Sequence, residues 1–378
     1  MFSIYSHHSP FSRDMDYVNA TLVPSSHCQQ GDFLSVDPHF DYPLSPRSTS
    51  PLSQSSSILG SSYNSNTSTL VAAQSKKVNY RQLSVKLEQD PRLYCSIMHQ
   101  VLPNFITVAV DPAGNYLCQS LIEHATTEQL GAMLAKMTTS WLSIVNHPHG
   151  TRVAQKMAEH IKFQSHYSHF VDNCMTWLTE MMKHNNGNHV LRKVVQHFPF
   201  HHSNCIYQAF LDNLDNYARD KYGVCVIQNA LDVTTEQVRV VFYQYLKPKV
   251  LEMITDKFAN YLVQYILDKA SPSMVEECIL CFLPQLNVLC RDQCASNVIE
   301  KAIKYASPYI RVKMINELST KAGDLAMDPF GNYVLQTALE YSDKRTFTIM
   351  STFLIQHEND LRMTPFVVII HIGKKCLE

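Results

Sequence analysis

The chain has 378 residues, of which 45% are apolar, and its formal net charge is −1 at neutral pH. This length and apolar content suffice for one large folded array with a continuous core. The longest apolar run, Phe366 to Ile370, is far too short to span a bilayer. The nearly neutral net charge argues against a ligand that is bound mainly through the net charge of the protein.

Residues 1–75 differ in composition from the rest of the chain. They include 19 Ser with scattered Pro, Asn and Thr and show no helical period, so we expect a disordered tail. The first ten residues are polar and rich in His, which predicts neither a signal peptide nor a membrane anchor. Ser45 and Ser50 each precede Pro, as in proline-directed phosphorylation sites, although such pairs also arise by chance in a Ser-rich tail.

After this tail, one short motif recurs seven times at intervals of 36, 37, 36, 36, 36 and 36 residues. Its copies read GNYLCQ, GTRVAQ, GNHVLR, GVCVIQ, ANYLVQ, ASNVIE and GNYVLQ. A period of this length predicts a solenoid of stacked helical units, because one unit cannot bury its own apolar face. We define the second position of the motif as offset zero, which is occupied by Asn115, Thr151, Asn188, Val224, Asn260, Ser296 and Asn332.

The positions of the motif divide into two groups on a helix that advances about 100° per residue. Offsets two, three, six and seven are apolar in nearly every copy, as in Leu117, Cys118, Leu121 and Ile122, and they predict a buried stripe. Offsets zero, one and four lie together on the other side. They are Asn115, Tyr116, Gln119; Thr151, Arg152, Gln155; Asn188, His189, Arg192; Val224, Cys225, Gln228; Asn260, Tyr261, Gln264; Ser296, Asn297, Glu300; and Asn332, Tyr333, Gln336.

This second group repeats an amide, then a flat or stackable side chain, then a second amide. A solvated helix face more usually carries Lys, Glu and Asp in no fixed order, so the repetition implies a repeated ligand. An unpaired base fits this chemistry. Two hydrogen-bonding side chains one turn apart can reach one base edge, and the planar group between them can lie on the face of the base.

At these residues the sequence resembles the Pumilio (PUF) family of single-stranded RNA-binding proteins, in which each helical repeat faces one base. The resemblance covers residues 76–378 and implies an all-α fold, a right-handed α-α superhelical solenoid that forms a crescent of about eight repeats. The first repeat is degenerate, and Tyr80, Arg81 and Ser84 align best with the motif. The implied divisions are 76–102, 103–138, 139–175, 176–211, 212–247, 248–283, 284–319 and 320–355, followed by a C-terminal cap at 356–378.

The resemblance also implies a role for each side chain, with the last repeat facing the 5′ base. It assigns base edges as follows: uracil to Asn332 with Gln336, guanine to Ser296 with Glu300, uracil to Asn260 with Gln264, adenine in part to Gln228, a poorly specified base to Asn188 with Arg192, adenine to Thr151 with Gln155, and uracil to Asn115 with Gln119. It assigns base stacking to Tyr116, Arg152, His189, Tyr261, Asn297 and Tyr333. The implied target is approximately UGUANAU.

The assignment of guanine to Glu300 has independent physical support. An ionised carboxylate only accepts hydrogen bonds, and guanine presents two donors on its pairing edge, whereas adenine or uracil would place an acceptor against it. The alternative is a solvated acid at a helix start, where the helix dipole favours it. The six sibling motifs favour base reading.

Three copies depart from the family pattern. Val224 replaces the expected small polar residue, and Cys225 offers no ring for stacking. Arg192 stands where Gln is usual, and as a donor it suits either an acceptor-rich base edge or a phosphate. Thr151 adds a methyl group to the expected Ser or Cys, which either tightens or displaces the adenine.

The charge of the array is unusual for a protein that binds nucleic acid. Residues 1–75 hold two basic and five acidic groups, which leaves 30 basic and 28 acidic groups, or +2, for the remainder. We therefore expect a modest salt dependence, with binding through stacking, base edges and a few local cations. These cations are Arg152, Lys156, Arg192, Lys193 and Lys301.

The 11 Cys residues raise the alternatives of a metal site or disulfides. Cys278 and Cys281 are spaced as CxxC, and Cys290 and Cys294 as CxxxC, but apolar residues at helical spacing interleave with them. This pattern favours free cysteines that act as small hydrophobic side chains over structural zinc. The odd count and the absence of a secretory leader predict a reducing compartment.

No sequence motif supports an enzyme: there is no phosphate-binding glycine loop, GxSxG or HExxH. The resemblance implies a monomer without cofactor or metal that binds the 3′ untranslated regions of messenger RNA in the cytoplasm. It would lower their translation or stability by recruiting proteins such as deadenylation factors. Two alternatives are a Pumilio-like protein that binds structured or ribosomal-precursor RNA without base selectivity, and a protein-binding scaffold of the armadillo or HEAT type.

Overall fold

A computed structural model describes residues 79–356, and every regular element in that range is a helix. The expected Ser-rich tail at 1–75 and the expected cap at 356–378 lie outside the described residues, except for Gln356. Within residues 79–356 no helix is long and apolar enough to cross a membrane.

Each of the seven repeats consists of a short helix, an inner helix and an outer helix in that order. The short helices are α4 (Phe105–Ala109), α7 (Trp141–Val145), α10 (Leu178–Met182), α13 (Leu214–Ala218), α16 (Val250–Met253), α19 (Leu286–Leu289) and α22 (Ala322–Ala326). The inner helices are α5 (Gly114–Glu123), α8 (Gly150–His160), α11 (Gly187–His197), α14 (Lys221–Val233), α17 (Asn260–Lys269), α20 (Ala295–Tyr305) and α23 (Gly331–Glu340). The outer helices are α6 (Thr127–Thr138), α9 (Gln164–Thr176), α12 (Phe200–Asp212), α15 (Glu236–Leu246), α18 (Pro272–Phe282), α21 (Pro308–Ser319) and α24 (Lys344–Gln356).

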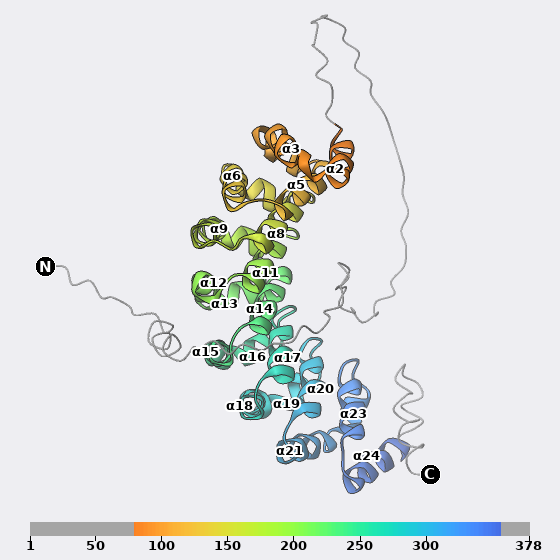
Figure 1. The fold of residues 1–378 in the computed structure, drawn as a ribbon. Coiled ribbons are helices and arrows are strands. Elements are labelled where there is room, and N and C mark those ends of the chain that lie inside the picture. Colours follow the sequence, from red (N-terminus) through yellow and green to blue (C-terminus); the bar gives the residue numbers. More distant parts are fainter. Residues whose placement is uncertain (1–78, 357–378) are drawn as a thin grey trace, which may run out of the picture. The chain divides into compact units, whose positions relative to one another are not determined.

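The inner helices lie side by side in one row, and the outer helices form a second row along the outside of the curve (Figure 1). We number the repeats by their inner helices, from repeat 1 with α5 to repeat 7 with α23. Before repeat 1, α2 (Tyr80–Gln89) packs against α5 and extends the inner row, and α3 (Tyr94–Val101) follows it. The hydroxyl of Tyr94 donates to the carbonyl oxygen of Leu121 at 2.7 Å, which ties these first helices to repeat 1. The single 3-10 turns are η1 (Pro91–Leu93), η2 (Leu102–Asn104), η3 (Lys247–Lys249) and η4 (Leu283–Gln285).

The core follows the apolar stripe that the motif predicts. In α20, Val298, Ile299, Ala302 and Ile303 are fully buried, and the equivalent residues of the other inner helices are buried as well. Burial of one such aliphatic side chain contributes about 1.5 to 3 kcal/mol. Each inner helix therefore depends on its neighbours, and the expected all-α solenoid is confirmed.

Glycine before offset zero allows the inner helix to approach the short helix closely. A Cβ atom at Gly114 would lie 2.4 Å from the carbonyl oxygen of Val108, and one at Gly150 would lie 2.6 Å from that of Ile144. No side chain fits at such distances without a shift of the backbone. The glycines of the motif therefore fix the start of the helix that carries the recurring polar side chains.

The nine cysteines among the described residues are free. Burial raises the pKa of Cys278 and of Cys290 to about 12, so both remain thiols at neutral pH. In this part of the chain no group of three or more His, Cys, Asp or Glu side chains is arranged to hold a metal ion.

Candidate functional site

The residue four positions before offset zero caps each inner helix. In repeat 7, the Oδ1 atom of Asp328 accepts from the backbone N–H groups of Phe330 at 2.9 Å and Gly331 at 2.7 Å. These bonds satisfy donors that the helix start leaves unpaired, and the carboxylate also suits the positive end of the helix dipole. The same arrangement occurs at Asp111, Asp220, Asp256, Asp292 and Asp328.

Repeats 2 and 3 use histidine at this capping position. The Nδ1 atom of His147 accepts from the N–H groups of His149 and Gly150 at 3.2 and 3.4 Å. In the next repeat, Nδ1 of His184 accepts in the same way at 3.1 and 3.3 Å. An imidazole carries no carboxylate, so these two caps bring no negative charge to the start of the helix.

The residues at offset zero are less accessible than the helical pattern predicts. Asn332 is 1% exposed and Ser296 is 4% exposed, because each lies in the first turn of an inner helix packed between its neighbours. The Nδ2 atom of Asn332 donates to the carbonyl oxygens of Asp328 at 2.9 Å and Pro329 at 3.0 Å. Most of this side chain is therefore committed to the helix start.

The glutamines at offset four are joined to these buried amides. Nε2 of Gln336 donates to Oδ1 of Asn332 at 3.2 Å, and the equivalent pairs in repeats 5 and 1 have distances of 2.9 and 3.0 Å. The asparagine thus orients the glutamine, which is itself half-buried. The predicted pairs Asn115 with Gln119, Asn260 with Gln264 and Asn332 with Gln336 are brought together.

The residues at offset one are the most accessible part of the motif. Tyr116 is 69% exposed, Arg152, His189 and Asn297 are exposed, and Tyr261 and Tyr333 are half-buried. The offset-four residues are half-buried in all seven repeats. Consecutive inner helices pack side by side, so the offset-one and offset-four side chains form one ladder along the inner row.

Glu300 is the one acidic residue among the seven offset-four residues. Its Oε2 atom accepts from the hydroxyl of Thr337 at 3.4 Å, across the boundary between repeats 6 and 7. Burial raises the pKa of Glu300, and the hydrogen bond from Thr337 opposes this effect. Ser296, the partner at offset zero, donates to the carbonyl oxygen of Gln293 at 3.4 Å.

The protein-family model of the Pumilio-family RNA binding repeat matches more than half of the chain. Its seven matches cover residues 104–138, 140–164, 178–210, 214–243, 249–280, 285–319 and 321–350. The chain belongs to the Pumilio family. Each match begins near a short helix and includes the inner helix of one repeat, so the family model and the structure divide the array in the same way.

Curated Pumilio proteins and solved Pumilio structures are similar to this chain. A Pumilio domain-containing protein of Schizosaccharomyces pombe is 28% identical over 51% of this chain and 28% of its own length. The suppressor protein MPT5 of Saccharomyces cerevisiae is 29% identical over 50% of this chain and 23% of its own length. The matches thus span about a quarter of these relatives. The Puf4 RNA-binding domain, solved with a 3′ UTR recognition sequence, is 29% identical with a TM-score of 0.73 over 78% of this chain and 95% of that domain. The RNA-binding domain of yeast Puf5p shares the fold at 23% identity, with a TM-score of 0.64 over 79% of this chain and 93% of that domain.

Pumilio repeat 4 differs from its neighbours in the way its offset-four side chain is used. Nε2 of Gln228 donates to the carbonyl oxygen of Tyr261, 2.9 Å away in the inner helix of repeat 5. Val224, at offset zero, is 3% exposed and has no polar group to orient the glutamine. Gln228 therefore helps to join two Pumilio repeats in this structure.

Pumilio repeat 2 uses a hydroxyl in place of the asparagine amide. Nε2 of Gln155 donates to Oγ1 of Thr151 at 3.1 Å, and that hydroxyl donates to the carbonyl oxygen of Asn186 at 3.1 Å. Thr151 thus orients Gln155 and also links repeat 2 to the turn before α11. The structure brings this predicted pair together as well.

Two of the lysines that the sequence indicated for RNA are engaged between Pumilio repeats. Lys156 pairs with Glu123 at 2.7 Å, and Lys193 pairs with Glu159 at 2.7 Å. In both pairs the lysine is at offset five and the glutamate is at offset eight of the preceding repeat. Tyr265 and Asp232 occupy the same two positions in repeats 5 and 4, and the hydroxyl of Tyr265 donates to Asp232 at 2.8 Å. These contacts join consecutive repeats. They could not be predicted from the sequence, because they depend on how the helices stack.

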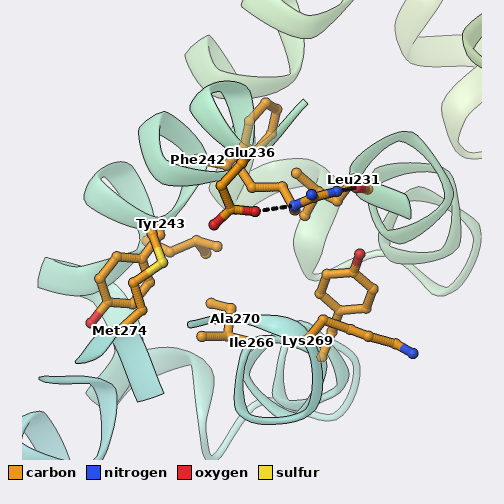
Figure 2. A pocket seen from close by; sticks show the side chains of 11 residues that line it. Leu231, Glu236, Phe242, Tyr243, Ile266, Lys269, Ala270 and Met274 are labelled. Carbon is orange, nitrogen blue, oxygen red and sulfur yellow. Dashed lines mark hydrogen bonds and ion pairs between the residues drawn. The ribbon is translucent and has the colours of Figure 1, made fainter. Parts of the chain in front are cut away.

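The seam between Pumilio repeats 4 and 5 contains a small pocket lined mainly by apolar side chains of α14, α15, α17 and α18 (Figure 2). Arg239 pairs with Glu236 at 2.9 Å on one wall, and its guanidinium also donates to the carbonyl oxygens of Leu231 and Thr234 near the end of α14. Arg239 thus acts as a cap for the inner helix. The pocket lies among side chains that hold the repeats together, and it is separate from the ladder of offset-one and offset-four residues.

Two parts of the site were not predicted, and only the first of them carries a readable signal in the sequence. The Asp and His caps recur with the period of the motif, four residues before offset zero. Thr337 stands at offset five of the last motif, but its contact with Glu300 could be found only from the packing of α20 against α23.

Proposed function

We propose that this protein binds single-stranded RNA in a sequence-specific manner and recognises UGUA-like elements, approximately UGUANAU, in the 3′ untranslated regions of messenger RNA. Membership of the Pumilio family supports this proposal, as does the similarity to the Puf4 domain solved with a 3′ UTR recognition sequence. Bound RNA would follow the inner row, with its 5′ end at repeat 7.

The observation that carries the proposal is the recurrence of a hydrogen-bonded polar pair, with a flat side chain at the neighbouring offset-one position, on the inner helices of repeats 1, 2, 5 and 7. Asparagine–glutamine pairs in repeats 1, 5 and 7 would read uracil, and Thr151 with Gln155 would read adenine. Glu300 would accept from the two donors of guanine at the second base, with a discrimination of about 1 to 3 kcal/mol. Gln228 would read the fourth base only after it releases the carbonyl oxygen of Tyr261.

The base-selective proposal is tested by titrating the full chain into labelled UGUANAU RNA and into a UCUANAU control, with fluorescence polarisation as the readout. We expect tighter binding of the first RNA by about tenfold or more. Equal affinities would favour a protein that binds structured RNA without base selectivity. No binding to either RNA would favour a protein-binding scaffold.

The regulatory part of the proposal is that the protein acts as a monomer in the cytoplasm and lowers translation or stability of the bound messenger RNA. It would do so as a binding protein rather than an enzyme, by recruiting co-repressors such as deadenylation factors. A reporter with UGUANAU in its 3′ untranslated region, compared with a UCUANAU reporter, tests this. Equal output from the two reporters in the presence of the protein would contradict it.

A further inference from the structure

The inner face of repeats 2 and 3 carries a group of cationic and imidazole side chains, here called the basic zone, made of Arg152, His189 and Arg192. Arg152 and His189 occupy the accessible offset-one positions of α8 and α11, which pack directly against each other. Arg192 lies one turn beyond His189 on α11. Partial desolvation of its ring against the neighbouring helices, and then the positive charges of Arg192 and Arg152, lower the pKa of His189, so the three side chains lie within electrostatic reach of one another.

The arginines of the basic zone lack the acidic partners that neutralise nearby cations. Lys156 and Lys193, on the same two helices, are paired with Glu123 and Glu159. Across residues 79–356, neither Arg152 nor Arg192 forms an ion pair with any carboxylate. Their positive charge therefore remains available to a ligand.

The helix caps make the same two repeats more positive. Five inner helices are capped by an aspartate, but α8 and α11 are capped by His147 and His184. A carboxylate is thus absent at the start of both helices that carry the basic zone. Since the dipoles of α8 and α11 also present partial positive charge at this end, the local field favours an anion.

Arg192 differs in chemistry from the side chain that most repeats place at offset four. Glutamine offers both a donor and an acceptor to a base edge, and in repeats 1, 5 and 7 it is oriented by an asparagine. The guanidinium only donates, and its fork matches two oxygens of one phosphate. Nδ2 of Asn188, at offset zero, already donates to the carbonyl oxygens of His184 and Asn185.

We propose that Arg192 binds a phosphodiester group of RNA instead of a base edge, within a basic zone completed by Arg152 and His189. This inference rests on the proposed function, because it assigns the central contact of the same RNA site. The repeats on both sides of repeat 3 then read bases, whereas repeat 3 binds the sugar-phosphate backbone of the RNA. The fifth nucleotide of UGUANAU is left without a base-edge reader.

The test uses the full chain and RNA of the form UGUANAU with each of the four bases at the fifth position. A second set carries a neutral methylphosphonate at one linkage at a time. We compare the wild type with Arg192→Ala, Arg192→Lys and the control Lys136→Ala, which removes an exposed charge on the outer helix α6. Affinities are measured over a series of salt concentrations.

We expect the wild type to bind the four bases at the fifth position within about threefold. Arg192→Ala should weaken all four equally, by about tenfold, and make the slope of log affinity against log salt shallower by about 0.7. One methylphosphonate should weaken the wild type but not Arg192→Ala. Arg192→Lys keeps the charge but loses the fork, so it should retain the wild-type salt slope and only part of the affinity, and Lys136→Ala should match the wild type.

A preference of more than about tenfold for one base at the fifth position, abolished by Arg192→Ala, would overturn the inference, because Arg192 would then read a base edge. A salt slope that Arg192→Ala leaves unchanged would also overturn it. In both cases, tighter binding of UGU than of UCU by the wild type would keep the proposed function intact. Loss of that contrast would overturn the proposed function and this inference together.

Discussion

The hydroxyl of Thr337 lies 3.4 Å from Oε2 of Glu300, so a side chain of repeat 7 holds the carboxylate that repeat 6 presents. The contact crosses a repeat boundary. The proposed guanine reader is therefore built from two repeats, and Thr337 acts as a positioning residue for Glu300.

Replacing Thr337 with valine should weaken the preference for guanine. Valine keeps the shape of the side chain but cannot donate to the carboxylate, so we expect the affinity difference between UGUANAU and UCUANAU to shrink by about 0.5 to 1.5 kcal/mol. Thr337→Ser, which retains the hydroxyl, is the matched control. If the serine and valine variants discriminate equally well, the contact does not position Glu300.

The guanine preference should decrease as the pH falls. Guanine requires the ionised carboxylate, and burial raises the pKa of Glu300, so protonation occurs above the usual pH for glutamate. The stability of the protein should change with pH in the opposite direction. The folded state binds the Glu300 proton more tightly than the unfolded state does, so the contribution of Glu300 to the free energy of unfolding increases as the pH falls through its raised pKa.

The ratio of affinities for UGUANAU and UCUANAU, measured from about pH 8 to about pH 5, isolates Glu300 because both RNAs share every other contact. Glu300→Gln should give a ratio that does not change with pH. A ratio for the wild type that stays constant across this range would show that the reader remains ionised or takes no part.

Removing the ring of Tyr116 should weaken RNA binding without regard to the base it faces. The side chain is 69% exposed, so Tyr116→Ala should change the free energy of unfolding by no more than about 0.5 kcal/mol. Loss of base stacking should cost about 1 to 3 kcal/mol of binding free energy. Tyr309→Ala removes a ring that is 76% exposed on the outer helix α21 and serves as the control. A loss confined to RNAs with uracil opposite repeat 1 would contradict a stacking role.

His184→Asp should stabilise the protein in the absence of RNA. A carboxylate would accept the same backbone N–H groups and would interact favourably with the dipole of α11, which adds about 0.3 to 1 kcal/mol. His184→Ala should instead destabilise it by about 0.5 to 2 kcal/mol through loss of the cap. Urea denaturation measures both. Equal stabilities of the aspartate and alanine variants would mean that His184 does not cap the helix.

The sequence predicts the buried stripe and the grouping of the proposed base readers because both follow from the helical period. Leu117 and Leu121 are buried as expected, and Gln336 reaches Asn332 because they are one turn apart on the same helix. The burial of Asn332 was not predicted, because a single helix does not reveal how closely its neighbours approach. The hydrogen bond from Gln228 to the carbonyl oxygen of Tyr261 was not predicted either, because its geometry depends on the stacking of two repeats.

The pairing of Lys193 with Glu159 has a consequence for variation in chain length. The interval between the motifs of repeats 2 and 3 is 37 residues instead of 36, yet this ion pair forms at 2.7 Å, the same as Lys156 with Glu123 one boundary earlier. The additional residue must therefore be absorbed between Glu159 and Leu178, in the segment that contains α9. An insertion on the convex side thus leaves the spacing between neighbouring inner helices unchanged, and this side is where the array can gain new loops without shifting the proposed nucleotide subsites.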